Sequence, residues 1–234
     1  MQAVILAGGK GTRLRPLSAS LPKPLVPVGD YPILEILLRR LAKQGFRDVV
    51  LCVGHLAELV MAFCGDGKRW GLKIRYVREE KPLHTAGALR LVRGLAPHFL
   101  VVNGDILTTL DFRALMRRHA RRGGWATLAV CPREARIDYG VVRLHGDESL
   151  EAYIEKPVIP YLVSMGINVF DRRAVGLIRR GEHIGIPDFA LRIQKAGKPV
   201  HGFRTDAEWL DIGRLEDYEA AQDLFAGDPR RFLR

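Results

Sequence analysis

The stretch AGGKGTRLRP, from Ala7 to Pro16, decides how the rest of the chain is interpreted, and it directly follows the apolar run AVIL at residues 3–6. A short apolar run with a β-branched pair predicts a buried strand. The three glycines allow tight turns because they lack a Cβ atom, and such turns let several backbone N–H groups face one anion. Lys10, Arg13 and Arg15 add positive charge beside them. We therefore predict that this loop, at the carboxyl end of a strand, binds a triphosphate.

Two familiar phosphate motifs do not account for this loop. The P-loop requires Gly-x-x-x-x-Gly-Lys-Ser/Thr, a spacing that the stretch does not contain. A dinucleotide fingerprint would require glycine or alanine at position 14, where this chain has Leu14. Taken alone, the stretch is also compatible with a glycine-rich hairpin that carries solvated charges.

A rigid segment follows, in which Lys23 lies between Pro22 and Pro24. Proline fixes its own φ angle and restricts the residue before it, so this lysine has little backbone freedom. A lysine held in this way suits a fixed phosphate contact. The alternative is a proline-rich surface loop whose lysine is solvated.

The residues LAGGKGTRLRPL at 6–17, followed by PKPL at 22–25, closely resemble the sugar-1-phosphate nucleotidyltransferases, also called NDP-sugar synthases or pyrophosphorylases. The resemblance runs from Gln2 to about Ala221 and is nearest to the mannose- or heptose-1-phosphate guanylyltransferases. It implies a catalytic domain over residues 1–226, with a basic, loosely held tail at 227–234. Many relatives continue into a β-helix of hexapeptide repeats, which is not found in this sequence.

Strands alternate with helices in the first half of the chain, which predicts an α/β fold with a mostly parallel sheet. The resemblance specifies this as a three-layer, Rossmann-like, GT-A-like fold with a mixed, mostly parallel sheet flanked by helices. The predicted strands are 2–6, 48–53, 73–77, 99–103, 126–130, 141–144, 150–154, 163–170 and 200–204. The predicted helices are 31–44, 55–64, 86–92, 112–122, 172–179, 188–196 and 215–225.

The composition is that of an ordinary soluble protein, with 47% hydrophobic and 27% charged residues. Apolar runs stay well short of the roughly 18 residues that span a bilayer, and the chain begins with a strand rather than a signal peptide. We therefore expect a cytoplasmic protein without a membrane partner. The three cysteines and seven histidines have neither disulfide nor zinc spacing. The net charge of +11 is spread over helix surfaces, so we expect no nucleic-acid partner.

Two aspartates are the predicted metal ligands. Asp105 follows an apolar strand at the edge of the sheet where the glycine loop lies, so its carboxylate suits Mg²⁺, although it could instead cap the next turn. The resemblance implies that the NGD sequence at 103–105 binds the essential metal. It also implies that Asp211, in WLDIGR at 209–214, completes the site.

The resemblance also assigns the two substrate sites. The residues implied for the nucleotide are Leu6, Ala7, Gly8, Gly9, Gly11, Thr12, Thr85 and Gly87. The residues implied for the sugar phosphate are Tyr139, Gly140, Glu155, Lys156, Gly166 and Asn168. His84, Ser164 and Asn168 depart from the family pattern, which leaves the identity of the sugar and the base open.

The reaction implied is the Mg²⁺-dependent transfer of a nucleotidyl group from an NTP to a sugar 1-phosphate, with Arg13 and Lys23 as the catalytic cations. GTP with mannose or heptose 1-phosphate is the first expectation, and a UTP- or dTTP-dependent enzyme is the alternative. A non-catalytic nucleotide-sensing subunit of the same fold is a further alternative, and homo-oligomers are compatible with all three.

Overall fold

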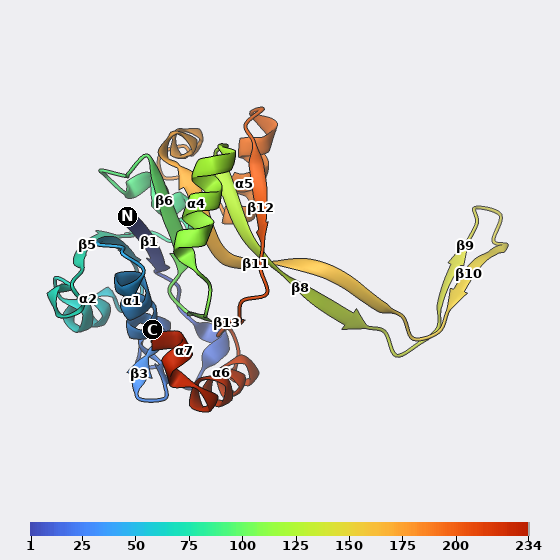
Figure 1. Cartoon of the computed structure of the whole chain (residues 1–234), viewed down its shortest axis with the longest axis horizontal. Helices are drawn as coiled ribbons and strands as arrows, with labels where there is room; N and C mark the ends of the chain where they lie inside the picture. The colour runs from blue at the N-terminus through green and yellow to red at the C-terminus, as the bar shows by residue number, and fades with distance from the viewer. Residues whose placement is uncertain (234) are drawn as a thin grey trace.

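In the computed structural model, which describes residues 1–233, a seven-stranded sheet carries helices on both faces (Figure 1). The strand order is β12-β8-β11-β6-β1-β4-β5. β11 is antiparallel to both of its neighbours, and the other pairs are parallel, which confirms the predicted mixed, mostly parallel sheet. The strands are β1 (Gln2–Ala7), β4 (Asp48–Val53), β5 (Lys73–Arg78), β6 (His98–Asn103), β8 (Ala126–Arg136), β11 (Val158–Asp171) and β12 (Val200–Arg204).

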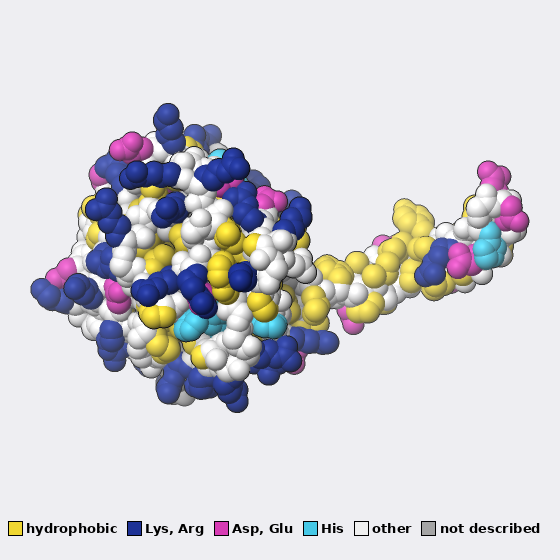
Figure 2. All heavy atoms as spheres, turned by 90° about the horizontal axis from the view of Figure 1, so that it is seen from above, with side chains coloured by type: hydrophobic (Ala, Val, Ile, Leu, Met, Phe, Trp, Pro, Cys, Tyr) yellow, Lys and Arg dark blue, Asp and Glu magenta, His cyan; other side chains and the backbone are white. Residues whose placement is uncertain are grey.

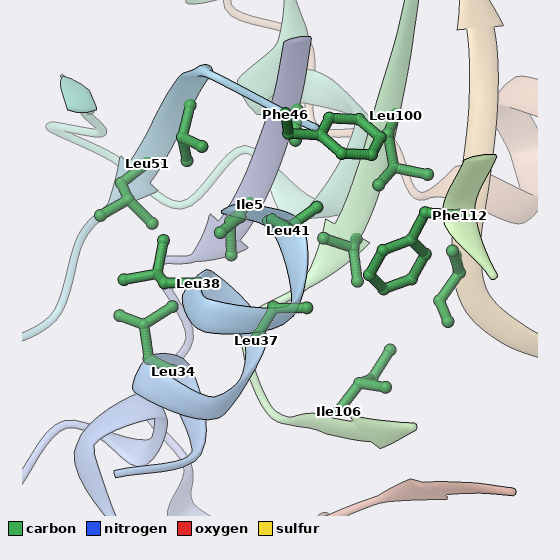
Figure 3. Packing of buried hydrophobic residues seen from close by; sticks show 14 of the residues in the cluster. Ile5, Leu34, Leu37, Leu38, Leu41, Phe46, Leu51, Leu100, Ile106 and Phe112 are labelled. Atoms are coloured by element: carbon green, nitrogen blue, oxygen red, sulfur yellow. The ribbon is translucent and has the colours of Figure 1, made fainter. Parts of the chain in front are cut away.

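Each face of the sheet has its own hydrophobic cluster, because successive side chains of a strand point to opposite faces. In β1, Ala3 and Ile5 belong to one cluster, and Val4 belongs to the other. Figure 3 shows the first cluster, in which the leucines of one helix face pack over Ile5 and Leu100. The helices on this face are α1 (Ile33–Lys43), α2 (Ala57–Cys64) and α4 (Phe112–Arg122).

The opposite face is covered by shorter helices. The segments predicted as helices at 86–92 and 172–179 are mainly 3-10 turns, whereas the helix predicted at 188–196 is α-helical. The elements on this face are α3 (His84–Gly87), η4 (Ala88–Leu91), η5 (Arg172–Leu177) and α5 (Ile186–Lys195).

A third cluster joins the two ends of the chain beside the sheet. Phe232 is fully buried, and its ring packs against that of Phe225 with the centroids 5.9 Å apart and the planes tilted by 35°. The expectation of a loosely held tail is therefore wrong for residues 227–233. The reason is that one aromatic side chain, too short a signal to find in sequence, docks the last helix on the body. The elements around this cluster are η1 (Thr12–Leu14), η2 (Lys23–Leu25), β2 (Pro27–Val28), β3 (Tyr31–Pro32), α6 (Leu215–Gly227) and α7 (Pro229–Leu233).

Within residues 1–233, three strand pairs stand apart from the large sheet, and one of them joins β2 to β3. β7 (Ile106–Thr108) pairs with β13 (Trp209–Asp211) directly below the sheet edge, and both were missed from sequence because they are only three residues long. β9 (Val141–Leu144) pairs with β10 (Leu150–Ile154), in agreement with the predicted strands.

β8 and β11 continue beyond the body as a two-stranded ribbon with the β9–β10 pair at its end (Figure 1). We call residues 132–162 the arm. The sequence predicted the strands of this region but made β8 and β11 too short, at 126–130 and 163–170. Within residues 1–233, the arm is the one part that projects away from the body (Figures 1 and 2).

Candidate active site

The glycine loop leaves β1 at the carboxyl edge of the sheet and lies against the ends of β4 and β5. A Cβ atom at Gly54 would lie 2.8 Å from the carbonyl oxygen of Gly8, and one at Gly8 would lie 2.7 Å from Glu79 Oε1. The backbone N–H of His55 donates to the Gly8 carbonyl at 3.3 Å. Glycine is therefore required at position 54, where a Cβ would meet backbone, whereas a Cβ at position 8 would meet only the movable end of the Glu79 side chain.

The far end of the loop is fixed to the segment that carries Lys23. Gly11 has a φ of +62°, a left-handed conformation that favours glycine. Ser18 Oγ donates to the Gly11 carbonyl at 2.6 Å, and a Cβ at Gly11 would lie 3.0 Å from Lys23 Cβ. The predicted phosphate loop and the predicted lysine thus form one packed unit.

Lys23 lies between the two predicted metal ligands. Its Nζ donates to Asp105 Oδ2 and lies 3.8 Å from Asp211 Oδ1. The lysine side chain is only 13% exposed, so this contact is shielded from bulk water. The structure therefore brings together three residues that the sequence had assigned to the same chemistry.

The antiparallel β7–β13 pair explains how the two aspartates meet. Asp105 directly precedes β7, and Asp211 ends β13 opposite Ile106. The backbone N–H of Ile212 donates to the Asp105 carbonyl oxygen at 3.1 Å. The backbone thus fixes the separation of the two carboxylates, whatever their side chains bind.

The electrostatics of this pair favour a cation. Burial raises the pKa of Asp211, the charge of Asp105 raises it further, and Lys23 opposes both effects. Asp105 Oδ1 is buried and has no hydrogen-bond partner within residues 1–233. Mg²⁺ typically takes one or two carboxylates together with phosphate oxygens and water, so the donor set fits this ion. Clusters of three or more His, Cys, Asp or Glu side chains that could form a closed metal site are absent from the described chain.

A cleft of about 760 Å³ runs along the glycine loop and reaches Asp105, while Lys23 and Asp211 lie outside its lining. Of the residues predicted to bind the nucleotide, Leu6, Gly8, Gly9 and Thr85 line it. His84, whose role the sequence left open, lines it as well. The complete lining is Leu6, Gly8, Gly9, Lys10, Gly54, His55, Arg78, Glu79, Glu80, Pro82, His84, Thr85, Ala88, Asn103 and Asp105.

Four predicted nucleotide residues lie outside this lining. Ala7 is buried in the sheet, and Gly11 and Thr12 lie at the start of η1. Gly87 is buried where a Cβ would lie 2.4 Å from the Glu182 carbonyl, so its geometry is that of a packing glycine. Arg13, the second predicted catalytic cation, lies in η1 near enough for its charge to lower the pKa of Asp211.

Sequence reasoning missed the residues that follow β4 and β5. Gly54 and His55 come directly after β4, and Glu79 and Glu80 come directly after β5. Burial raises the pKa of Glu79, and its Oε2 accepts from the Leu83 backbone N–H at 3.1 Å. The signal that could have found them is positional, because all carboxyl ends of parallel strands meet at one edge.

The residues predicted for the sugar phosphate fall into two groups. Gly166, with a φ of +67°, and the buried Asn168 lie on the body, and a Cβ at Gly166 would lie 2.6 Å from Asn103 Nδ2. Asn168 Oδ1 lacks a hydrogen-bond partner among residues 1–233. The other four, Tyr139, Gly140, Glu155 and Lys156, lie on the arm, outside the cleft lining (Figure 1).

Residues 2–226 match the nucleotidyl transferase family, and the chain therefore belongs to it. It is 33% identical, over 93% of its length, to a UTP–glucose-1-phosphate uridylyltransferase from Synechocystis sp.. It is 32% identical, over 97% of its length, to a mannose-1-phosphate guanylyltransferase from Mycobacterium tuberculosis. The chain spans 61% and 65% of these two relatives, which is less than two thirds of each.

Solved structures agree with the fold. A Bacillus anthracis protein named as a glucose-1-phosphate thymidylyltransferase superposes with a TM-score of 0.78 at 23% identity, covering 96% of this chain and 95% of that one. HddC from Yersinia pseudotuberculosis gives a TM-score of 0.73 at 24% identity, covering 96% and 99%. These identities support the GT-A-like architecture alone. Within residues 1–233, helices long and apolar enough to cross a membrane are lacking.

Proposed function

We propose that this protein transfers a nucleotidyl group from an NTP to a sugar 1-phosphate, giving an NDP-sugar and pyrophosphate. The observation that carries the proposal is the group formed by Lys23, Asp105 and Asp211, of which Asp105 lines the cleft that runs along the glycine loop. Both of the curated relatives described above are named for reactions of this class.

The glycine loop and its cations are suited to a triphosphate. Gly8 and Gly9 line the cleft, where their backbone N–H groups would bind phosphate oxygens, and Lys10 supplies a charge beside them. Lys23 and Arg13 would neutralise the charge that develops on the α-phosphate and the departing pyrophosphate. Phosphoryl-type transfer depends mainly on positioning and charge neutralisation, and these residues supply both.

Asp105 and Asp211 are the residues that would hold Mg²⁺. Bound there, the ion supplies charge neutralisation and orients phosphate oxygens. The buried, unpartnered Oδ1 of Asp105 and the raised pKa of Asp211 both favour a cation between these carboxylates. Lys23 occupies the same negative site in the protein described here.

The bond changes are simple. An oxygen of the sugar phosphate forms a bond to the α-phosphorus of the NTP. The bond from that phosphorus to the oxygen that bridges the α- and β-phosphates breaks, and this oxygen leaves as a terminal oxygen of pyrophosphate. The phosphate monoester is already ionised near neutral pH, so a general base is not required. Lys156 would orient this nucleophile and Glu155 would bind sugar hydroxyls.

We propose GTP as the nucleotide. Glu79 and Glu80 line the cleft beside Gly8, where a base would stack over the loop. Guanine presents adjacent N1–H and N2–H₂ donors, which one carboxylate can accept together, whereas uracil and thymine present one N–H between two carbonyl oxygens. The carboxylates therefore favour guanine, and the M. tuberculosis relative is named as a guanylyltransferase.

Mannose or heptose 1-phosphate is the proposed acceptor, in the cytoplasm where nucleoside triphosphates are available. The alternative is a UTP- or dTTP-dependent enzyme, since the Synechocystis relative is named as a uridylyltransferase. A non-catalytic sensing subunit is a weaker candidate, because such a protein should have lost phosphate or metal ligands. Arg13, Lys23, Asp105 and Asp211 are all retained.

The experiment that tests the substrates is pyrophosphate release with Mg²⁺ across GTP, UTP, dTTP, CTP and ATP. Each nucleotide is paired with glucose, mannose and heptose 1-phosphates. We expect GTP with mannose or heptose 1-phosphate to give the highest kcat/KM. A preference for UTP or dTTP would replace the proposed base and leave the reaction class intact.

A further inference from the structure

The arm has the surface of a segment that is buried in its functional state. Of the large hydrophobic side chains that are exposed within residues 1–233, ten lie on the arm and six elsewhere. Tyr139 is 79% exposed, and Leu150 and Tyr153 are each 62% exposed. Figure 2 shows hydrophobic side chains along most of the arm. An isolated two-stranded ribbon is at best marginally stable in water, and apolar patches of this kind mark interaction sites.

The arm also carries part of the proposed active site. Glu155 and Lys156 follow β10 directly and are exposed to solvent. Lys23 of the body site packs against the glycine loop instead, and its ammonium group contacts Asp105 and Asp211. If the proposed function holds, a single chain in this conformation has the residues that bind the nucleotide in place, whereas Glu155 and Lys156, which would bind the sugar phosphate, lie away from them.

The arm leaves the body at the edge of the sheet where the site lies. β8 and β6 are both antiparallel to β11, so β8 runs in the same direction as β6 and β1. The carboxyl end of β8 therefore points past the cleft rather than to the opposite side of the body. A register shift between Ser164 and Asn168, around Gly166, marks the position where β11 enters the body.

The pairing of the arm's strands is continuous from this point outward. Each residue from Val158 to Ser164 on β11 pairs with one from Arg136 to Val130 on β8. This ladder extends the ribbon away from its own cleft, and folding back would require these pairs to bend or break. A second molecule can cover the ribbon without disturbing the ladder.

Charge indicates what that second molecule is. Residues 132–162 contain four Lys and Arg against six Asp and Glu, a net charge of −2. Since the whole chain carries +11, the remainder carries +13. Figure 2 shows acidic side chains gathered at the end of the arm and Lys and Arg spread over the body. The arm is thus complementary in charge to the body of another copy of this chain.

We propose that two copies of this chain exchange their arms. Each arm lies across the cleft of the other copy and supplies Glu155 and Lys156 to a site whose Lys23, Asp105 and Asp211 come from that copy. Such an exchange is isologous, so it closes as a two-fold dimer and covers both arms at once. The roles given to these residues rest on the proposed function. The exchange of arms between two copies does not depend on it.

The first test is the oligomeric state, measured by sedimentation velocity at micromolar concentration. The wild type should be a dimer. A variant in which residues 137–157 are replaced by a short Gly-Ser turn, joining the paired neighbours Arg136 and Val158, should be a folded monomer. A monomeric wild type, or a dimeric truncated variant, overturns the exchange even if the protein proves to have another activity.

The second test is complementation between two inactive variants, Asp105→Asn and Lys156→Ala, carrying different tags and co-expressed. The heterodimer, isolated through both tags, contains one site with an intact body and an intact arm. Its turnover should be about half that of the wild-type dimer, while each homodimer loses most of its activity. Failure to recover turnover, or failure to isolate a heterodimer, contradicts the exchange.

Two controls make this result specific. A heterodimer of Asp105→Asn with Asp211→Asn should stay inactive, because both bodies are damaged. Arg143→Ala, which removes a different exposed arm cation, should keep wild-type turnover. If the wild type itself releases no pyrophosphate with any substrate pair, the proposed function fails, and sedimentation still decides whether the arm joins two copies.

Discussion

Asp105 and Asp211 stand 106 positions apart in sequence, yet their carboxylates share the ammonium group of Lys23. The backbone N–H of Ile212 donates to the Asp105 carbonyl at 3.1 Å, so the distance between the two acids is set by main-chain pairing. A cation site built in this way keeps its geometry when either side chain is changed. Substitution at these positions therefore tests chemistry rather than folding.

Replacing either aspartate by asparagine should abolish most of the activity. Asp105→Asn and Asp211→Asn each remove a charge that the proposed Mg²⁺ requires, and we expect kcat to fall by about a thousandfold, or about 4 kcal/mol. Pyrophosphate release and circular dichroism measure the activity and the fold. Asp223→Asn, on the exposed face of α6, is the matched control and should keep wild-type kcat. Equal activity in all three variants would show that the two acids hold no catalytic ion.

Lys23→Ala should reduce kcat by roughly a hundredfold, because a preorganised cation near the developing charge is lost. Lys23→Arg should recover only part of the rate, since a planar guanidinium does not reproduce the point charge held between the two carboxylates. Lys43→Ala, which removes an exposed lysine of α1, is the control. A kcat for Lys23→Ala near that of the wild type would leave this lysine a purely structural role.

Glu79→Gln should change the choice of nucleotide. The substitution removes a carboxylate that can accept two guanine donors, so kcat/KM for GTP should fall by a factor of about 10 to 100, or 1–3 kcal/mol. The kcat/KM for UTP should change much less. The measurement is therefore the ratio of kcat/KM for GTP to kcat/KM for UTP, in the wild type and in the variant. An unchanged ratio would exclude Glu79 from base recognition and would weaken the case for GTP.

Gly54→Ala should lower both stability and nucleotide affinity. Its new Cβ would lie 2.8 Å from the Gly8 carbonyl oxygen, a backbone atom that cannot move without shifting the glycine loop. We expect a loss of about 1–3 kcal/mol in the free energy of unfolding, measured by denaturant titration. Gly176→Ala meets no neighbour within 4 Å in the described chain and should change stability by less than about 0.5 kcal/mol.

The free energy of unfolding should fall as pH is lowered from 6.5 toward 4. Burial lowers the pKa of His119 to about 4, and the neighbouring His98 adds to this effect. In the unfolded chain His119 is protonated below about pH 6.5, whereas in the folded chain it stays neutral down to about pH 4. Each pH unit in this window therefore lowers the free energy of unfolding by up to about 1.4 kcal/mol. Stability is retained above pH 6.5. If the free energy of unfolding of His119→Gln depends on pH between 4 and 6.5 as steeply as that of the wild type, groups other than His119 cause the pH dependence.

Local signals in the sequence predicted most of the body. Continuous apolar runs such as residues 99–103, and the helical spacing of the leucines in α1, are strong because both depend on short-range periodicity. The same signals failed for β7 and β13, which are three residues long, and for α7, which Phe232 docks on the body. Elements this short are stabilised by tertiary contacts that periodicity does not encode.

The residues of the candidate site also fall into those that local sequence predicted and those that it did not. The glycine loop, Lys23 and the two aspartates were predicted from motifs. In the structure Lys23 contacts both aspartates, and Asp105 lines the same cleft as Gly8 and Gly9. Glu79 and Gly54 were missed because nothing in their local sequence marks them, and only the sheet order makes them neighbours of Gly8. The position of Lys156 outside the cleft lining could not be predicted from the sequence either, since motif order gives no information on the direction of the arm.

The measurement that tests the central claim most directly is pyrophosphate release by the wild type with GTP and Mg²⁺, with and without mannose 1-phosphate. We expect rapid release of pyrophosphate that requires both substrates and yields GDP-sugar in equal amount. Release from GTP alone would indicate a hydrolase. A folded protein that binds GTP and releases no pyrophosphate with any sugar 1-phosphate would contradict nucleotidyl transfer.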